Sequence, residues 1–245
     1  MFPTVIRTRE EFESICDEIN TIACYAVVIW SDVKAHPAVN TPSVLFVHIR
    51  NQWVVFSFNH NEAPHLPIEW LDELVPYEMH TPYKKDLLYL IKSGCIVDCA
   101  EAEYIKTGTV ALPINPVTTE EMYRRYSGIK NINKAVPIMK LLEWAEMIRT
   151  EWPLGNKESF LSKIAIPVYQ YIESSGLKVD TTKCKDPSMV DGFVYSQYSP
   201  YHITGRPSNA FGGVNYAAIP KNTRAREAFV SRFDGGKLVL MDYES

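Results

Sequence analysis

The sequence lacks the marks of several common protein classes. Its five cysteines are an odd number with no CxxC spacing, and its N-terminus has no signal-peptide pattern. These two absences favour a reducing compartment such as the cytosol over a disulfide framework. No apolar run is long enough to span a bilayer. We therefore expect a soluble protein with no membrane partner.

An excess of positive charge is also missing. The net charge is −4 over 245 residues, which does not suit a self-sufficient DNA-binding protein, so any contact with DNA has to be local. The sequence has no P-loop, no GxSxG motif and no dinucleotide-binding fingerprint. Its six histidines show no HExxH or other metal-binding spacing, and we interpret them as structural.

The pattern of apolar residues predicts a mixed sheet covered by helices. With 46% hydrophobic and 22% charged residues, the chain can bury a core, so we expect one main domain and an appendage. Spacings of three and four indicate helices, and short β-rich runs indicate strands. Helices are predicted at 9–20, 68–75, 84–92, 119–126, 133–152 and 156–174, and strands at 24–30, 43–50, 53–58, 95–99 and 237–241. The fold class is therefore α/β (α+β).

Four short motifs follow one another near the C-terminus. They are Thr204-Gly205-Arg206 with Ser208; Asn215 with Ile219-Pro220; Arg226 with Ala228-Phe229; and the apolar run 238–241 that ends in Asp242-Tyr243. In this order and at this spacing they resemble the palm entrance of family A DNA polymerases. The last of them resembles motif A, an apolar strand that delivers a carboxylate to a metal site. Ala217 and Ala218 depart from the polar pair that is usual in the family.

The resemblance assigns roles to particular residues. Asp242 would be the catalytic carboxylate and, with the main-chain carbonyl of Tyr243, would bind Mg²⁺ for two-metal nucleotidyl transfer. An arginine in the minor groove can probe hydrogen-bond acceptors that all correct base pairs share. A local basic cluster suits contacts with phosphates, although a solvated loop is an equally good interpretation of the cluster alone. The DNA-binding residues implied are Thr204, Arg206, Asn215, Lys221, Arg224 and Arg226.

Residues 160–180 resemble the family helix at the start of the polymerase domain, with Gly176, Lys178 and Asp180 in matching places. In the family a helical thumb follows, but here only the polar stretch 181–192 separates this helix from the palm motifs. We therefore predict four parts. They are a 3′-5′ exonuclease-like domain (1–152), a connecting helix (153–180), a linker that replaces the thumb (181–192) and a partial palm (193–245).

The first part would then be an RNase H-like domain, whose nuclease chemistry needs carboxylates that hold two metal ions. The first expected motif, Asp-x-Glu near 28–32, is replaced by Val-Ile-Trp-Ser-Asp. Asp86 matches the second motif and Asp98 a nearby aspartate, whereas Asn133-Lys134 stands where the third acid is expected. The sequence therefore predicts a vestigial exonuclease that serves as a scaffold.

Two functions remain open at this point. The chain can be one subunit of a split, phage-like polymerase, inactive alone and completed by a C-terminal chain that carries the fingers and the rest of the palm. Primer–template DNA and dNTP would bind to the assembled enzyme. Alternatively, it is a noncatalytic DNA-binding or protein-binding module derived from a polymerase, or the product of a truncated reading frame.

Overall fold

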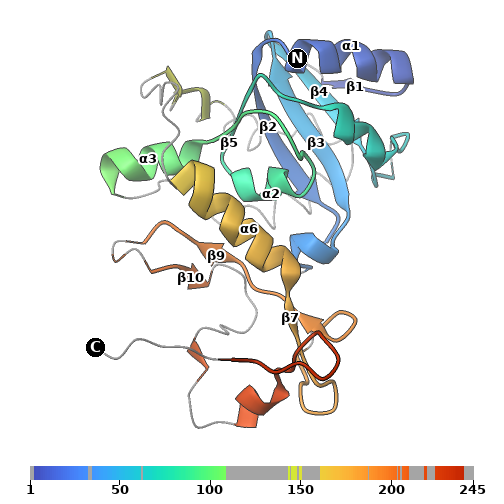
Figure 1. The fold of residues 1–245 in the computed structure, drawn as a ribbon. Coiled ribbons are helices and arrows are strands. Elements are labelled where there is room, and N and C mark those ends of the chain that lie inside the picture. The colour runs from blue at the N-terminus through green and yellow to red at the C-terminus, as the bar shows by residue number, and fades with distance from the viewer. Residues whose placement is uncertain are drawn as a thin grey trace.

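The computed structural model describes residues 3–32, 35–61, 63–108, 143, 145–147, 149–150, 161–186, 188–202, 204, 206–209, 218–219 and 224–239. Within these ranges, six strands form one mixed sheet, and helices lie on it (Figure 1). A smaller β-structured unit follows. The mixed α/β fold predicted from the sequence is therefore confirmed. No helix within the described ranges is both long and apolar enough to cross a bilayer.

Strand β2 lies inside the sheet, where it pairs with β3 on one side and with β5 on the other. The sheet order is β1-β4-β3-β2-β5-β6. Strand β3 runs antiparallel to its neighbours β2 and β4, whereas the β1–β4, β2–β5 and β5–β6 pairs are parallel. The bounds are Thr4–Val5 (β1), Ala23–Trp30 (β2), Pro42–Ile49 (β3), Gln52–Ser57 (β4), Glu78–Thr81 (β5) and Ile96–Asp98 (β6).

A two-residue turn joins β3 to β4. Arg50 and Asn51 have φ angles of 46° and 60°, and positive φ at both central residues is typical of a type I′ hairpin turn. The sequence-based prediction placed this turn one residue later, at Asn51-Gln52. That placement is wrong, because Gln52 already pairs with Ile49 in the sheet.

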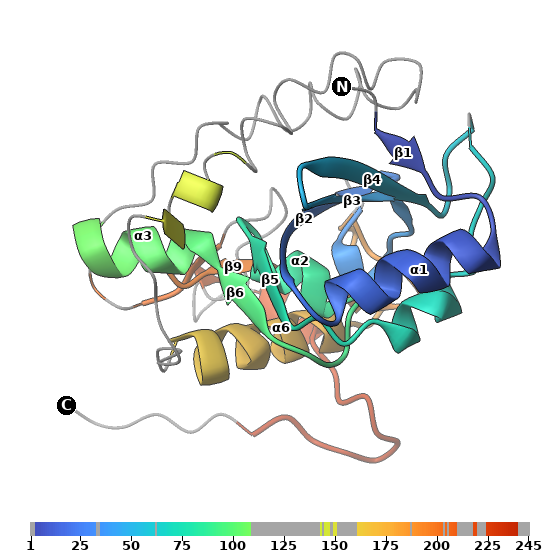
Figure 2. The ribbon, with the colours of Figure 1, turned by 90° about the horizontal axis from the view of Figure 1, so that it is seen from above.

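Helix α1 (Arg9–Ile19) covers part of the sheet (Figure 2). A capping box fixes its start, because the Thr8 side chain accepts from the Glu11 main-chain N–H while the Glu11 side chain accepts from that of Thr8. Its buried residues Phe12, Cys16 and Ile19 recur at helical spacing and join the main core. The helix therefore begins and packs as its sequence predicts, and it ends at Ile19, one residue before the predicted end.

Several elements differ from the prediction. The helix expected at 68–75 is the 3-10 helix η2 (Ile68–Glu73), and the one at 84–92 is the shorter α2 (Lys84–Leu88). Strands β1 and β5 and helix α3 (Cys99–Thr107) were not predicted. Strand β5 carries three polar residues in four, and α3 buries five consecutive residues at its start. Neither shows the periodicity that a half-exposed element has.

The long predicted helix 156–174 is described from residue 161. It consists of a π-helical turn, η4 (Leu161–Ala165), followed by α6 (Ile166–Ser175), and it ends at Gly176 as predicted. Pro167 lies in the first turn of α6, directly after the π-helical turn, and it has no N–H to donate to that turn. Figure 1 shows α6 running beside α2, and the two helices are in contact.

The chain after α6 forms a small β unit. Strand β7 (Leu177–Lys178) pairs with β8 (Phe193–Val194), and β9 (Tyr198–Ser199) pairs with β10 (Ser208–Asn209). The predicted linker 181–192 is therefore the loop between two paired strands. A 3-10 helix, η6 (Arg224–Ala228), comes next. Residues 237–239 form no strand, contrary to the prediction for 237–241, whose last two residues lie outside the described ranges.

Candidate functional site

One edge of the sheet gathers the ends of three parallel strands. Trp30 ends β2, Thr81 ends β5 and Asp98 ends β6, so these residues lie at the same edge, which we call the carboxyl edge. From β2 the chain continues to β3 and β4 on one side, and later returns to β5 and β6 on the other. In open α/β sheets, ligands bind at the carboxyl ends of strands where the connections diverge in this way. The carboxyl edge is therefore the candidate site.

Asp86 and Asp98, the two acids predicted from the sequence, both lie near this edge. Asp86 is partly buried on α2, and burial raises its pKa to about 6, with the positive charge of Lys85 opposing the rise. Asp98 is buried, and its carboxylate accepts from the main-chain N–H groups of Glu101 (2.9 Å) and Lys84 (3.2 Å). Asp98 thus caps α3 and fixes the start of α2, which is a structural role.

Trp30 occupies the place where the first exonuclease motif was expected. Two residues further on, the main chain of Asp32 is bound by the Asn40 side chain, which accepts from its N–H at 3.2 Å and donates to its carbonyl. Among the described residues, no group of three acidic, histidine or cysteine side chains could hold a metal ion. The expected third motif, Asn133-Lys134, lies outside the described residues.

A buried acid on α6, Glu173, was missed by the sequence analysis. Its side chain is fully buried, and its Oε1 accepts from Lys85 Nζ (2.6 Å) and from the Tyr198 main-chain N–H (2.6 Å). The other oxygen, Oε2, is buried with no hydrogen-bond partner in the part of the chain that is described. Burial raises the pKa of Glu173, and Lys85 opposes this rise. Its spacing of seven from the buried Ile166 was the available signal, because both share one helix face.

Residues 195–202, which we call the aromatic segment, cross the carboxyl edge. His36 contacts the Ser196 carbonyl oxygen at 3.0 Å, and the Tyr104 hydroxyl donates to the carbonyl of His202 at 2.9 Å. Burial lowers the pKa of His36 to about 4, so the ring is neutral at neutral pH. Its Nδ1 accepts from the Ala38 N–H, so we assign the proton to Nε2, which donates to Ser196. The carboxyl edge is therefore covered by a later part of the same chain.

The predicted polymerase residues are only partly described. Thr204 and Arg206 are exposed, and the Thr204 hydroxyl lies 3.1 Å from His202 Nδ1. Arg226 donates to the Ile219 carbonyl from Nη2 (2.8 Å) and Nε (3.3 Å), and Arg224 begins η6. Four predicted residues lie outside the described ranges: Asn215, Lys221, Asp242 and Tyr243. Their roles, and any contact with DNA, stay predictions.

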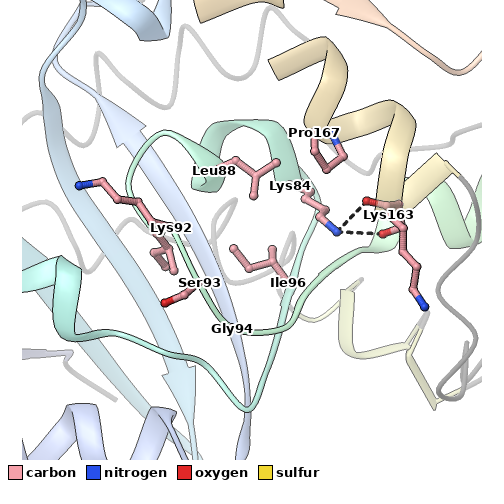
Figure 3. Close-up of a pocket in the computed structure, with 10 residues that line it drawn as sticks. Lys84, Leu88, Lys92, Ser93, Gly94, Ile96, Lys163 and Pro167 are labelled. Carbon is pink, nitrogen blue, oxygen red and sulfur yellow. Dashed lines mark hydrogen bonds between the residues drawn. The ribbon is translucent and has the colours of Figure 1, made fainter. Parts of the chain in front are cut away.

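A basic pocket of about 210 Å³ lies between α2 and the start of the α6 region (Figure 3). Lys84 Nζ donates to both the carbonyl and the hydroxyl of Ser162, each at 3.0 Å. Lys92 pairs with Asp72 at 2.7 Å. Two of its lysines thus already have partners within the chain, and Lys84 joins α2 to η4.

Neither a protein-family model nor a curated protein sequence matches the chain. Solved structures that are similar include the exonuclease domain of Aedes aegypti Nibbler, with 9% identity, a TM-score of 0.32, and coverage of 60% of this chain and 88% of that one. Escherichia coli RNase D, an exoribonuclease, has 11% identity, a TM-score of 0.31, and coverage of 62% and 48%. The catalytic core of Trypanosoma brucei RRP6 has 11% identity, a TM-score of 0.29, and coverage of 70% and 63%.

The chain spans about half the length of RNase D and most of the Nibbler domain. A likeness at this level of identity and TM-score says nothing about substrate or activity. The function has to be inferred from the residues of this chain.

Proposed function

We propose that the chain is the N-terminal subunit of a family A-type DNA polymerase and contributes Asp242 to a two-metal site that a second chain completes. One observation carries the proposal. The two segments that resemble the family, 160–180 and 204–243, meet in one β unit. Val179 bridges Phe229 in antiparallel fashion, the Asp180 N–H donates to the Ala228 carbonyl at 2.8 Å, and the Val230 N–H donates to that of Lys178 at 3.1 Å.

The pairing supports the proposal because the two resemblances are independent in sequence. About fifty residues separate the paired segments, and closing such a loop has an entropic cost that only specific contacts offset. Arg232 strengthens the junction, since its guanidinium donates to the carbonyls of Ser175 (2.9 Å) and Gly176 (2.8 Å) at the end of α6. Residues 175–180 of the first segment therefore pack against residues 228–232 of the second.

The described residues that precede Asp242 in the chain include large apolar side chains that are exposed to solvent. Phe233, Leu238 and Val239 are 74%, 63% and 78% exposed. Exposed apolar side chains that lead into a strand-like sequence are an aggregation hazard unless another chain covers them. A partner that adds the remaining palm and the fingers would bury these side chains and supply the other metal-binding carboxylate, which has no counterpart in this sequence.

The donor set of the proposed metal site suits Mg²⁺, since a carboxylate and a main-chain carbonyl are hard oxygen ligands. Mg²⁺, when bound, would activate the primer hydroxyl and stabilise charge on the leaving oxygens. Asp242 and the Tyr243 carbonyl would hold it. Arg206 and Asn215 would contact the minor groove, while Lys221 and Arg224 would contact phosphates.

The test is primer extension with Mg²⁺ and all four dNTPs. The chain is assayed alone and with its candidate C-terminal partner, as wild type, as Asp242→Asn, and as Asp234→Asn, a control at an exposed acid in the preceding turn. We expect extension only in the mixture, loss of extension in Asp242→Asn and its retention in Asp234→Asn. No extension with a partner that binds would contradict the proposal and leave a noncatalytic DNA-binding or protein-binding module.

A further inference from the structure

Tyrosines recur at every third position of the aromatic segment. Each tyrosine ring lies beside an aromatic ring from an upstream part of the chain, at distances typical of favourable aromatic pairs. The pairs, with their centroid separations, are Tyr195 with His36 (5.2 Å), Tyr198 with Tyr169 (6.4 Å) and Tyr201 with Tyr104 (5.5 Å). The segment is therefore fitted to the surface on which it lies along its whole length.

The centre of the segment is held by an ion pair between the partly buried Lys85 and the fully buried Glu173. Lys85 on α2 and Glu173 on α6 lie 2.6 Å apart, and both bind the main chain of Tyr198. The Tyr198 N–H donates to Glu173 Oε1 at 2.6 Å, and Lys85 Nζ donates to the Tyr198 carbonyl. Two side chains thus bind both main-chain hydrogen-bonding groups of one residue. We call this arrangement the latch.

The ion pair and the segment depend on each other energetically. A buried ion pair is tolerated only when further hydrogen bonds satisfy its charges. Tyr198 provides one such bond to Glu173 and one to Lys85, while Glu173 Oε2 has no partner among the described residues. If the segment left, Glu173 would keep only the hydrogen bond from Lys85 among the described residues. The latch therefore favours the docked segment strongly.

The latch also reaches the residues assigned to DNA. Tyr198 and Ser199 form β9, whose partner β10 is Ser208–Asn209, so Thr204 and Arg206 lie in the loop between two paired strands. The Thr204 hydroxyl lies 3.1 Å from the His202 ring. A displacement of Tyr198 would therefore move both ends of this loop.

We propose that Lys85 and Glu173 are positioning residues, which fix Tyr198 and through β9 and β10 set the place of the loop that carries Thr204 and Arg206. The role of the loop in DNA binding rests on the proposed function, but the latch does not. The carboxyl edge, where a ligand would be expected, thus takes a peptide segment of its own chain as its occupant.

The test uses the full chain without DNA or partner. The double variant Lys85→Met/Glu173→Leu removes both charges at similar volume, so it leaves no buried unpaired charge. The matched control, Lys92→Met/Asp72→Asn, removes the exposed ion pair. In hydrogen–deuterium exchange we expect peptides covering 195–202 and 206–209 to exchange about tenfold faster or more in the latch variant, because hydrogen bonds to charged groups are lost. Peptides of β2 and β3 should be unchanged, as should every peptide of the control.

Unchanged exchange in both segments would overturn the latch, and faster exchange in 195–202 alone would overturn its positioning role. If the double variant loses protection throughout the sheet, Glu173→Gln decides the matter. Gln keeps an acceptor for the Tyr198 N–H, so we expect amide exchange in the same two segments to accelerate less than in the double variant. Exchange at the wild-type rate in both segments would overturn the proposal.

A second measurement separates this inference from the proposed function. The affinity of the assembled enzyme for a primer–template duplex is measured by fluorescence anisotropy for the wild type and both variants. Weaker binding in the latch variant, with an unchanged melting temperature, supports positioning of the DNA-binding loop, and equal binding contradicts it. If the exchange experiment supports the latch but the wild-type assembly binds no DNA, the polymerase proposal is overturned and the latch is not.

Discussion

The indole ring of Trp30 lies edge-on to the phenol ring of Tyr89, with centroids 6.1 Å apart and ring planes at 85°. This pair fills the end of β2, the place where the resemblance to polymerase exonuclease domains calls for an acidic pair. Edge-to-face aromatic pairs stabilise beyond the area that they bury. Trp30 thus contributes to the packing between the end of β2 and the C-terminal end of α2, where Tyr89 is the C-cap.

Trp30→Ala should lower the free energy of unfolding by about 3 kcal/mol, because it removes a large, partly buried ring that packs against the core. Trp30→Phe keeps an aromatic ring beside Tyr89 and should cost about 1 kcal/mol. Urea unfolding followed by circular dichroism measures both. A loss below about 1 kcal/mol in the alanine variant would show that the ring contributes little to packing.

Asp86→Asn should stabilise the protein at neutral pH and have little effect in acid. Burial raises the pKa of Asp86 from 3.8 to about 6, so between these values the folded chain holds a proton that the unfolded chain has released. The stabilisation from the protonated form is complete below pH 3.8 and is lost as the pH rises through about 6. The gain of the asparagine variant at pH 7 should be about 1–3 kcal/mol.

Unfolding of Asp86→Asn at pH 4 and at pH 7 tests this expectation, with Asp72→Asn as the control. Asp72 is exposed and forms only a surface pair with Lys92, so its variant should differ from the wild type by less than about 1 kcal/mol at both pH values. A gain at Asp86 that is equal at both pH values would disprove the ionisation argument.

Gly94→Ala should be far more costly than Gly108→Ala. Both glycines have positive φ, 93° and 72°, but a Cβ at Gly94 would lie 2.5 Å from the Pro76 nitrogen, whereas nothing lies within 4 Å of one at Gly108. We expect losses of about 3 kcal/mol or more at Gly94 and about 1 kcal/mol at Gly108. Thermal unfolding compares the two, and equal losses would show that the backbone at Pro76 relaxes freely.

Arg226→Ala distinguishes two roles for the basic cluster. If Arg226 serves chiefly to bind the Ile219 carbonyl, as we expect, the variant should speed amide exchange around η6 and leave the salt dependence of DNA binding unchanged. Loss of a phosphate contact instead reduces the slope of log affinity against log salt by about 0.9. Arg224→Ala, at a predicted phosphate contact, provides the comparison. A smaller salt-dependence slope in Arg226→Ala would instead support the phosphate contact that the sequence predicts for Arg226.

The sequence predicts the elements whose local pattern and tertiary role agree. Helix α1 has a cap and an apolar stripe, and β2, β3 and β4 are β-rich runs around a short turn, so local residues suffice to define them. Strand β5 is different. It lies between β2 and β6, and its polar residues Glu78 and His80 hydrogen-bond each other. Its stability comes from neighbours that are distant in sequence, and no local pattern reveals it.

The candidate site shows the same limit. Asp86 and Asp98 could be selected from the sequence, because they match motifs, although Asp98 proves to be a helix cap. The Lys85–Glu173 pair could not be, since 88 positions separate the two residues. Burial of Glu173 could be anticipated from its helix face, but its partner could not. Periodicity identifies which side of a helix is buried, but it does not identify the charged residue from another element that pairs with it.

The aromatic segment also bears on the order in which the chain folds. Its contacts join residues 160, 113 and 98 positions apart, whereas β3 and β4 are joined by a two-residue turn. Contacts between distant residues form late, because the loop that they close must first lose its entropy. As synthesis proceeds from the N-terminus, the strands of the sheet leave the ribosome well before residue 195. We therefore expect the carboxyl edge to close late in folding, and until then Lys85 lacks its hydrogen bond to the Tyr198 carbonyl.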